Sequence, residues 1–463
     1  MATAVGKEVP AGVWQQHLRV GLSLSIVTFA QLATSFGIQW YTVTQLGAGA
    51  ETDALYAGAT LPQIVMVVLI EPLGFVLTPM LSVMGEPERR RAGWWLFWLL
   101  TFISFLIALL LFLLVPVTMP LLAPGFSAST AQLTQGLARI QLAAAVGAIC
   151  TMMLSSLYHA EHKFLWPAIV TLTWSLLGWF ILIAGLQYGG VTLAAWVQVL
   201  CYIGPVLFLM PAIGWLPPTG HCNLSAILVD LWRQVKPLMA STAFYRTGFV
   251  VDRFLASLLV PGSVVILELA WRVQLAIVRV LNQGITTPIV PVLASLSSQG
   301  SWPAFKTRYR DRLKWVGLLS VGAVMGLVTV AFAVPHFFQG GGGHPMIGAL
   351  GSQDLHDLLL ALVAGSGVLL FGSVNHLLMS AFYAQGETRA PTRIQMLSYS
   401  FGIILKVCGF FFGGLYGIMA AMSVYYAAEG LALGVALDRR LSLRLRAEAQ
   451  PSLGLSPAGV PPP

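Results

Sequence analysis

The stretch Tyr245–Gln283 reads YRTGFVVDRFLASLLVPGSVVILELAWRVQLAIVRVLNQ. Its hydropathy predicts two membrane-spanning helices joined by Pro261-Gly262-Ser263. A charge inside a membrane span costs about 2.5 to 17 kcal/mol, so charged groups there are expected to face a protein interior or a water-filled cavity. This hairpin nevertheless contains Arg246, Asp252, Arg253, Glu268, Arg272 and Arg279.

The composition of the whole chain is that of a membrane protein. Of its 463 residues, 57% are hydrophobic and only 9% are charged, whereas soluble domains have about 25% charged residues. The four cysteines are scattered without the C-x-x-C spacing of a metal or redox centre. They are expected to be small core residues, and no metal site is predicted.

Runs of about 20 mostly apolar residues are long enough to cross a membrane as helices. We therefore predict an all-α polytopic membrane protein with about 12 transmembrane helices. The expected spans are 20–46, 54–84, 94–122, 139–158, 165–187, 191–215, 238–260, 264–295, 315–338, 358–384, 395–415 and 417–437.

These spans form two groups of six. The first apolar run, Val20–Leu46, is too long for a cleavable signal peptide and is expected to remain as the first span. The predicted parts are a cytoplasmic segment 1–19, an N-terminal lobe 20–215, a cytoplasmic linker 216–237, a C-terminal lobe 238–437 and a disordered cytoplasmic tail 438–463.

The basic residues between the spans all fall on one side of the membrane. Clusters such as 89–91, 306–314 and 439–446 follow alternate spans, while the opposite loops contain no Lys or Arg. The positive-inside rule therefore predicts that both termini are cytoplasmic. Because these basic loops lie beside the membrane, contact with anionic lipid headgroups explains them better than nucleic acid does.

An internal repeat relates the two halves. The segment 158–167 has Tyr, an acid, a base and Pro in the same order as the segment 383–391. Thr78-Pro79 late in the second span likewise parallels Thr287-Pro288 late in the eighth. Parallel repeats of this kind build transporters with a central site between two lobes. We therefore expect two parallel six-helix lobes around a central cavity.

The charges of the hairpin favour an anionic substrate. Glu268, Arg272 and Arg279 are spaced by four and seven residues, which places them on one helical face. Arginine suits phosphate because its planar fork binds two oxygens and stays protonated. Asp252 and Glu268 would tune the site or bind a coupling ion.

The alternative is structural ion pairing, with Arg253 near Asp252 and Arg272 beside Glu268. Four arginines against two acids leave an excess of positive charge within the hairpin, which favours the functional interpretation. Elsewhere, Glu71 precedes Pro72 in the middle of a span, which predicts a helix break that lines a cavity. The chain has no G-x-S-x-G, H-E-x-x-H or P-loop motif, so we do not expect an enzyme.

Several collinear motifs resemble the MurJ/MviN lipid II flippases of the multidrug/oligosaccharidyl-lipid/polysaccharide exporter superfamily. The likeness extends from about residue 25 to 440. The shared order of the motifs carries the resemblance, since each motif alone is a weak signal. The motifs are Leu46-Gly-Ala-Gly49 with Thr52-Asp53-Ala54, Leu61-Pro62, Ala123-Pro124-Gly125-Phe126, Pro261-Gly262-Ser263 with Ala270-Trp-Arg272, Pro288-Ile-Val-Pro291, Phe382-Tyr383-Ala384 and Thr388-Arg389-Ala-Pro391.

This resemblance implies a flippase of the bacterial inner membrane that works by alternating access. Its substrate would be an anionic, polyprenyl-pyrophosphate-linked saccharide such as a lipid II-like peptidoglycan precursor. Arg272 matches the family's functional arginine in span 8, Asp53 its acid after span 1 and Glu71 a span 2 acid. No cofactor is expected beyond a possible coupling cation, Na⁺ or H⁺. The expected partners are membrane lipids and no nucleic acid, and the expected state is a monomer.

The chain also departs from the family pattern. The family's span 1 arginines fall near Gln31 and Gly37, its span 2 arginine near Met66, and the acid after the span 8 arginine at Leu275. The family's two further C-terminal spans have no counterpart. Two alternative functions are therefore kept: a cation-coupled drug or metabolite exporter, and a non-transporting scaffold of cell-wall synthesis.

The candidate substrate-binding residues are Arg272, Arg279, Arg253 and Arg246, and the candidate coupling or gating residues are Asp252, Glu268, Asp53 and Glu71.

Overall fold

The fold is all-helical in the part of the chain that the computed structural model describes, which is residues 11–214, 218, 223–338 and 348–449. The chain divides into two units. The first unit comprises residues 1–268 and 344–355, and the second comprises 269–343 and 356–463. The division at Glu268 falls inside a helix, whereas the lobes predicted from the sequence, with a linker at 216–237, stay a prediction.

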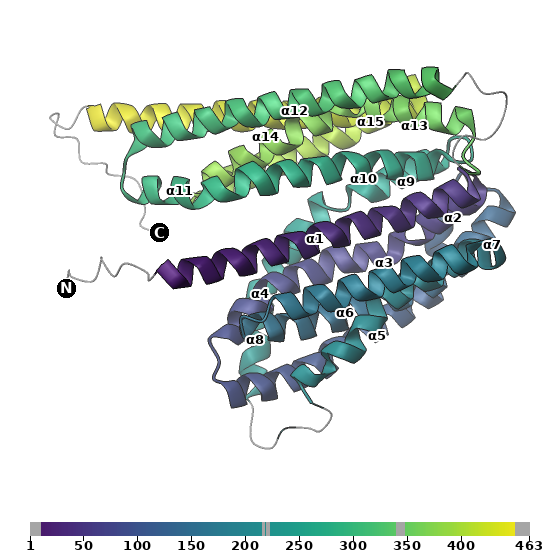
Figure 1. Cartoon of the computed structure of the whole chain (residues 1–463), viewed down its shortest axis with the longest axis horizontal. Helices are drawn as coiled ribbons and strands as arrows, with labels where there is room; N and C mark the ends of the chain where they lie inside the picture. Colours follow the sequence, from purple (N-terminus) through teal and green to yellow (C-terminus); the bar gives the residue numbers. More distant parts are fainter. Residues whose placement is uncertain (1–10, 215–217, 219–222, 339–347, 450–463) are drawn as a thin grey trace. The chain divides into compact units, whose positions relative to one another are not determined.

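The first unit is packed around α6 (Ala128–Ala160). In the most apolar 18-residue segment of this helix, 67% of the residues are buried. Figure 1 shows α6 beside α5 (Glu86–Leu122) and α7 (Leu165–Leu209). A Cβ at Gly147 of α6 would lie 2.9 Å from the backbone of α7 at Ile203, so only glycine allows this close approach. The unit also contains α1 (Ala11–Leu46), α2 (Ala50–Gly58), α3 (Thr60–Val65), α4 (Glu71–Ser82), α8 (Leu224–Tyr245), α9 (Gly248–Ser257) and the start of α10 (Ser263–Leu281).

The second unit is packed around α14 (Ser366–Tyr383), in which 56% of the residues are buried. The backbone N–H of Gly367 donates to Ser423 Oγ at 3.0 Å, which joins α14 to α15 (Arg389–Ala449). Leu377, Phe382 and Leu437 belong to the buried core of this unit. Its other helices are α11 (Thr287–Ser298), α12 (Trp302–Phe338), most of α13 (Ser352–Ala364) and the remainder of α10 from Leu269.

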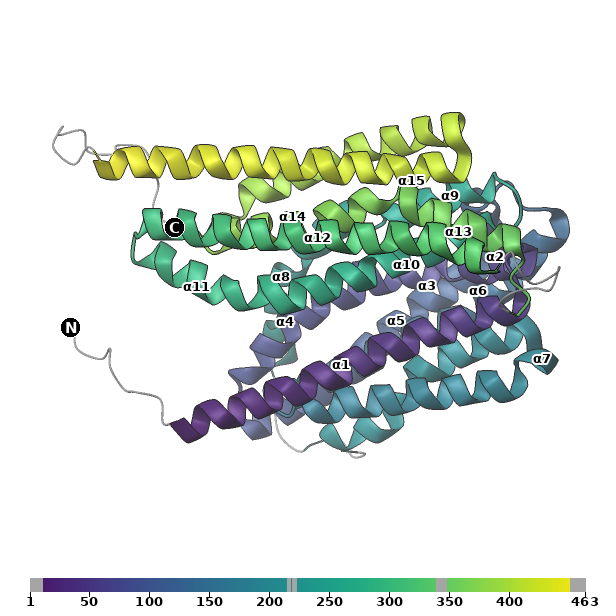
Figure 2. The ribbon, with the colours of Figure 1, turned by 45° about the horizontal axis from the view of Figure 1, so that its top comes forward.

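Two long helices fold back on themselves at glycines in the same place of the repeat. Gly190 in α7 has φ 50° and ψ −147°, and Gly414 in α15 has φ 53° and ψ −128°. Both φ values lie in the region that favours glycine. Figure 2 shows the two legs of α15 running alongside each other. The bend at Gly190 lies between the spans predicted at 165–187 and 191–215, and the bend at Gly414 lies one residue before the predicted end of the span 395–415.

The internal repeat extends to the helix ends. His162 after α6 and Gly386 after α14 both have positive φ, at 60° and 71°. In each case the N–H of the next residue donates to a carbonyl five residues earlier: Lys163 donates to Tyr158, and Glu387 donates to Phe382. This is the Schellman arrangement that ends a helix. The repeat predicted from the residues at 158–167 and 383–391 therefore has a matching backbone geometry.

Each half also contains a π-helical turn followed by proline. Met66–Ile70 precedes α4, and Asn282–Thr286 precedes α11. Proline lies in the first turn of both helices that follow, at Pro72 and Pro288. The break predicted at Glu71-Pro72 is thus a π-helical turn, a feature frequent at functional sites. The structure pairs Pro288 with Pro72, and the sequence-based pairing with Pro79 is wrong.

Seven helices among the described residues are long and apolar enough to cross a membrane. Two of these seven are the folded helices α7 and α15, each of which contains two predicted spans. The span predicted at 238–260 is instead divided between α8 and α9 at Arg246 and Thr247. The structure supports a polytopic helical membrane protein, and the count of twelve spans stays a prediction.

Candidate functional site

Three polar contacts, all within the first unit, join the helical segment 50–82 to α8, α9 and the start of α10. We call these three contacts the polar ladder. They are Asp53 with the backbone of Gly262 and Val265, Arg253 with Thr60, Gln63 and Glu268, and Arg246 with Glu71. Because the partners of 50–82 appear in reverse order along 246–265, the two segments run antiparallel.

The first contact places a buried carboxylate at the N-terminus of α10. Asp53, which is only 2% exposed, accepts N–H groups from Gly262 at 2.7 Å and from Val265 at 2.9 Å. The first N–H groups of a helix lack partners within the helix and favour a negative charge. Asp53 therefore caps a helix that lies more than 200 residues further along the chain.

The turn before α10 requires glycine. Gly262 has φ +96°, and a Cβ there would lie 2.8 Å from the carbonyl oxygen of Ala48. On the other side of this contact, Thr52 Oγ1 donates to the carbonyl of Gly47 at 2.9 Å and accepts the N–H of Gly49 at 3.0 Å. These bonds fix the entry into α2 and thereby the position of Asp53.

The second contact buries a complete ion pair. Arg253 is 2% exposed, and its Nη2 donates to Glu268 Oε2 at 3.0 Å and to Gln63 Oε1 at 2.7 Å. Its Nη1 donates to Thr60 Oγ1 at 3.1 Å, and its guanidinium lies 5.2 Å from the ring centre of Phe249. A buried charge with these partners is stable, whereas removal of one partner would leave the other uncompensated.

The third contact joins two helix breaks. Arg246 lies just after the last residue of α8, and Glu71 directly follows the π-helical turn before α4. Their side chains form an ion pair while remaining 45% and 40% exposed. Exposed pairs contribute little to stability, typically about 0 to 1 kcal/mol. This contact can therefore open at lower cost than the other two.

The charge excess predicted for the hairpin is smaller than the sequence suggests. The count of four arginines against two acids considered the hairpin alone, and Glu71 from another span pairs with Arg246. Glu268 pairs with Arg253. The substrate-binding role of all four arginines stays a prediction, and the structure shows Arg246 and Arg253 engaged in ion pairs with acids of the first unit.

The remaining predicted residues lie in or beside the same helices. Asp252 is buried in α9, next to Arg253 in the chain. Arg272 is half-buried in α10, and Arg279 is exposed near the C-terminal end of that helix, where the structure shows it in no ion pair with any described residue. Both arginines belong to the second unit.

Sequence reasoning did not identify the uncharged partners Thr60 and Gln63. Neither carries a charge that would mark it as unusual within a span, although a glutamine in an apolar run is a usable signal. Buried Asn375 and Glu429 in the second unit were not among the predicted site residues, and Asn375 Nδ2 donates to Glu429 Oε2 at 3.3 Å. Among the described residues, no group of three or more His, Cys, Asp or Glu could hold a metal ion.

Comparison with known proteins adds a family. The family model described as "Lipid II flippase MurJ" matches residues 42–454. A curated relative, the probable lipid II flippase MurJ of Vibrio cholerae, is 22% identical over 214 residues. That alignment covers 46% of this chain and only 38% of the relative.

Solved structures show the fold. A structure of the lipid II flippase MurJ in an inward closed conformation matches with a TM-score of 0.75 at 18% identity, covering 91% of this chain and 90% of that one. An inward-facing multidrug resistance transporter of the MATE family matches with a TM-score of 0.70 at 14% identity. That match covers 90% of this chain and 96% of the MATE transporter.

Proposed function

Because the chain belongs to the MurJ family of lipid II flippases, whose model matches most of its length, we propose that it is a flippase of the bacterial inner membrane. It would act as a transporter and not as an enzyme. Its substrate would be a polyprenyl-pyrophosphate-linked saccharide, the class to which lipid II belongs. The observation that carries the proposal at the level of residues is the polar ladder, which joins charges on the candidate membrane span 50–82 to charges on α9 and α10 and at the end of α8.

We propose different roles for the four arginines of the hairpin. Arg253 is enclosed by protein partners and would position α9 and α10 rather than bind substrate. Arg272 and Arg279 would bind the pyrophosphate, since guanidinium groups bind phosphate oxygens in a bidentate manner. Arg246 would join them when its exposed pair with Glu71 opens.

The acids would gate the transporter. Asp53 and Glu71 connect the segment 50–82 to the helices that precede the substrate-binding arginines. We expect these contacts to form in one state of the transport cycle and to break in the other. A coupling cation, Na⁺ or H⁺, would compete for the carboxylates of Asp252, Glu268, Asp53 or Glu71 when their protein partners withdraw.

Reconstitution tests the proposal. Purified protein in vesicles with labelled lipid II should move the lipid between leaflets, and Arg272→Ala and Arg279→Ala should slow this movement. Arg139→Ala is a matched control, because Arg139 also lies in an apolar helix but packs over Phe112 outside the ladder. Equal rates for all three variants and the wild type would rule out the cationic site. Complementation of a flippase-depleted bacterium tests the same function in cells.

A second candidate is a cation-coupled drug exporter, which the fold likeness to MATE transporters favours. Such an exporter would bind cationic compounds through acids such as Glu268 and Glu71. In this structure both acids are ion-paired with arginines, which argues against their availability. A drug-accumulation assay in cells that lack their own exporters separates the two candidates, since only the exporter lowers the accumulation of cationic dyes.

A further inference from the structure

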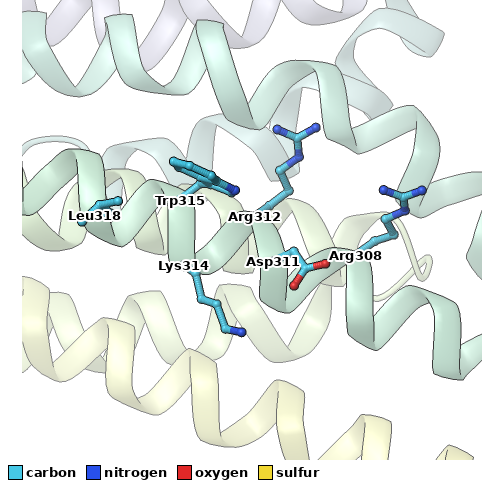
Figure 3. Close-up of a pocket in the computed structure, with 6 residues that line it drawn as sticks. All are labelled: Arg308, Asp311, Arg312, Lys314, Trp315 and Leu318. Atoms are coloured by element: carbon cyan, nitrogen blue, oxygen red, sulfur yellow. The ribbon is translucent and has the colours of Figure 1, made fainter.

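A basic and aromatic pocket lies on α12 in the second unit (Figure 3). It has a volume of about 510 Å³ and is lined by Arg308, Asp311, Arg312, Lys314, Trp315 and Leu318. Three bases against one acid give it a net positive charge. All six residues come from one helix, so the pocket is a surface feature of α12 in the second unit.

Two of the arginines point to the same side of the helix. Arg308 and Arg312 are four residues apart, and Trp315 follows three residues later, which places all three on one helical face. Figure 3 shows both guanidinium groups projecting to the same side. Arg308 and Arg312 form no ion pair with any residue of the described ranges, whereas Arg310 on another face meets Asp438 at 3.5 Å.

Beyond the pocket, the exposed surface of α12 becomes apolar. Leu318 is 62% exposed, Val321 47% and Met325 60%. In the most apolar 18-residue segment of this helix, only 11% of the residues are buried. A Cβ at Gly322 or Gly326 would have no atom within 4 Å, so the surface there is open. A positively charged end therefore continues directly into an open apolar face.

We propose that this face binds an anionic glycerophospholipid of the surrounding membrane. The phosphate would lie between Arg308 and Arg312, where two guanidinium forks supply charge-assisted hydrogen bonds. Trp315 would lie at the boundary between headgroup and acyl chains, the usual place of tryptophan in membrane proteins. An acyl chain would follow Leu318, Val321 and Met325. The proposal does not depend on the transported substrate.

The amphipathic character of this surface favours a lipid over a free anion. Inorganic phosphate would use the arginines but leave the adjoining apolar residues without a role. A zwitterionic phospholipid would use the apolar residues, but its own cationic group would reduce the attraction to the arginines. An anionic phospholipid is complementary to both parts, and the positive-inside rule places this end of α12 at the anionic cytoplasmic leaflet.

Lipid titration of the purified full-length protein in detergent tests the proposal, with native mass spectrometry to count bound lipids. Phosphatidylglycerol should bind more tightly than phosphatidylcholine. The double variant Arg308→Gln/Arg312→Gln should weaken phosphatidylglycerol binding about 30-fold, because each basic residue near an anionic membrane surface contributes about 1 kcal/mol and 1.4 kcal/mol is tenfold. Arg312→Lys, which keeps the charge but loses the fork, should give a smaller loss.

The matched control is Arg389→Gln/Arg393→Gln. These arginines are also exposed and four residues apart, on α15 of the same unit, but the residue three positions further is Met396 rather than tryptophan. This control should bind phosphatidylglycerol like the wild type. Wild-type affinity in the Arg308/Arg312 double variant, equal binding of phosphatidylcholine, or full competition by inorganic phosphate at a concentration equal to that of the lipid would each overturn the proposal.

Discussion

Asp53 Oδ1 lies 2.9 Å from the backbone nitrogen of Val265, a residue 212 positions further along the chain. The second carboxylate oxygen accepts the N–H of Gly262, so a single side chain from α2 caps the N-terminus of α10. The cap is buried, and it lies at the start of the helix that carries Arg272 and Arg279. The first turn of α10 is therefore held by a side chain that lies more than 200 residues earlier in the chain.

Asp53→Asn should destabilise the protein and impair transport. An amide offers one acceptor oxygen and points an NH₂ group at the other N–H, so one charge-assisted bond is lost at a cost of about 1.5–3 kcal/mol. Asp354→Asn is the control, since Asp354 accepts the N–H of Gly351 at 3.0 Å in a partly exposed cap. Thermal unfolding in detergent should show the larger drop in Tm for Asp53→Asn. An equal drop for both variants would contradict the importance of burial.

A double-mutant cycle at Arg253 and Glu268 should show strong coupling. Arg253→Met alone leaves a buried carboxylate without its cation, which costs about 3–5 kcal/mol. Arg253→Met combined with Glu268→Leu removes both charges and should recover much of that loss. The free energy of unfolding, measured for the four proteins of the cycle, checks this. Additive effects of the two changes would mean that the ion pair is not the main interaction.

Flipping assays on the same four proteins separate structure from transport. If Arg253 only positions α9 and α10, the double variant should regain transport together with stability. If Arg253 binds substrate, the double variant should be stable yet inactive.

Hydropathy was sufficient to predict an all-helical membrane protein and to divide the residues of α7 and of α15 into two spans each, because the predicted spans end close to Gly190 and Gly414. It could not identify the partners of the hairpin charges. Glu71 is 175 residues from Arg246, and Gln63 is 190 residues from Arg253. Spacing along one helix reveals only neighbours three or four residues away. The partner of a buried charge depends on which spans pack together, and a single sequence does not contain that information.

Exchanging the charges of Glu71 and Arg246 should separate gating from stability. Because both side chains are more than a third exposed, the single changes Glu71→Gln and Arg246→Gln should alter Tm only slightly. They should nevertheless change the flipping rate if this pair opens and closes during transport. The double exchange Glu71→Arg/Arg246→Glu restores the attraction and should recover part of the rate, as measured in vesicles. Wild-type rates for both single variants would exclude a gating role.

Glu387 should make stability depend on acidic pH. The N–H of Ala390 and the guanidinium of Arg440 both bond its carboxylate and hold its pKa below the ordinary value of 4.5. A carboxyl with a lowered pKa in the folded state stabilises the protein above its unfolded pKa, and this contribution is lost as the pH falls through the folded pKa. The Tm of the wild type should therefore decrease as the pH falls below about 4.5, the pKa of the unfolded group.

Glu387→Gln should flatten this part of the pH profile, since glutamine does not titrate. Glu161→Gln provides a comparison in the first unit. Bonding to Lys163, and then the charges of Lys163 and Arg89, lower the pKa of Glu161, but its side chain is more exposed than that of Glu387, at 33% against 21%. We expect a smaller change for Glu161→Gln. A profile unchanged by Glu387→Gln would show that the carboxylate contacts do not contribute to folding.

The bends at Gly190 and Gly414 should both be intolerant of side chains, because both glycines have a positive φ, and at Gly190 the reason lies in the backbone alone. A Cβ at Gly190 would meet no atom within 4 Å, so crowding cannot be the cause of any loss. Its φ and ψ of 50° and −147° lie near the region that only glycine occupies readily, where another residue costs about 1–3 kcal/mol. Gly190→Ala and Gly414→Ala should therefore lower the stability by similar amounts.

Gly136→Ala in α6 is the matched control for these two variants. A Cβ at Gly136 also meets no atom within 4 Å, but the residue lies in regular helix. There alanine is favoured over glycine by about 1 kcal/mol, so the substitution should raise Tm or leave it unchanged. If Gly190→Ala behaved like Gly136→Ala, the bend in α7 would not require glycine. Opposite signs for the two substitutions would show that the backbone turn, rather than the available space, determines the residue at each bend of the repeat.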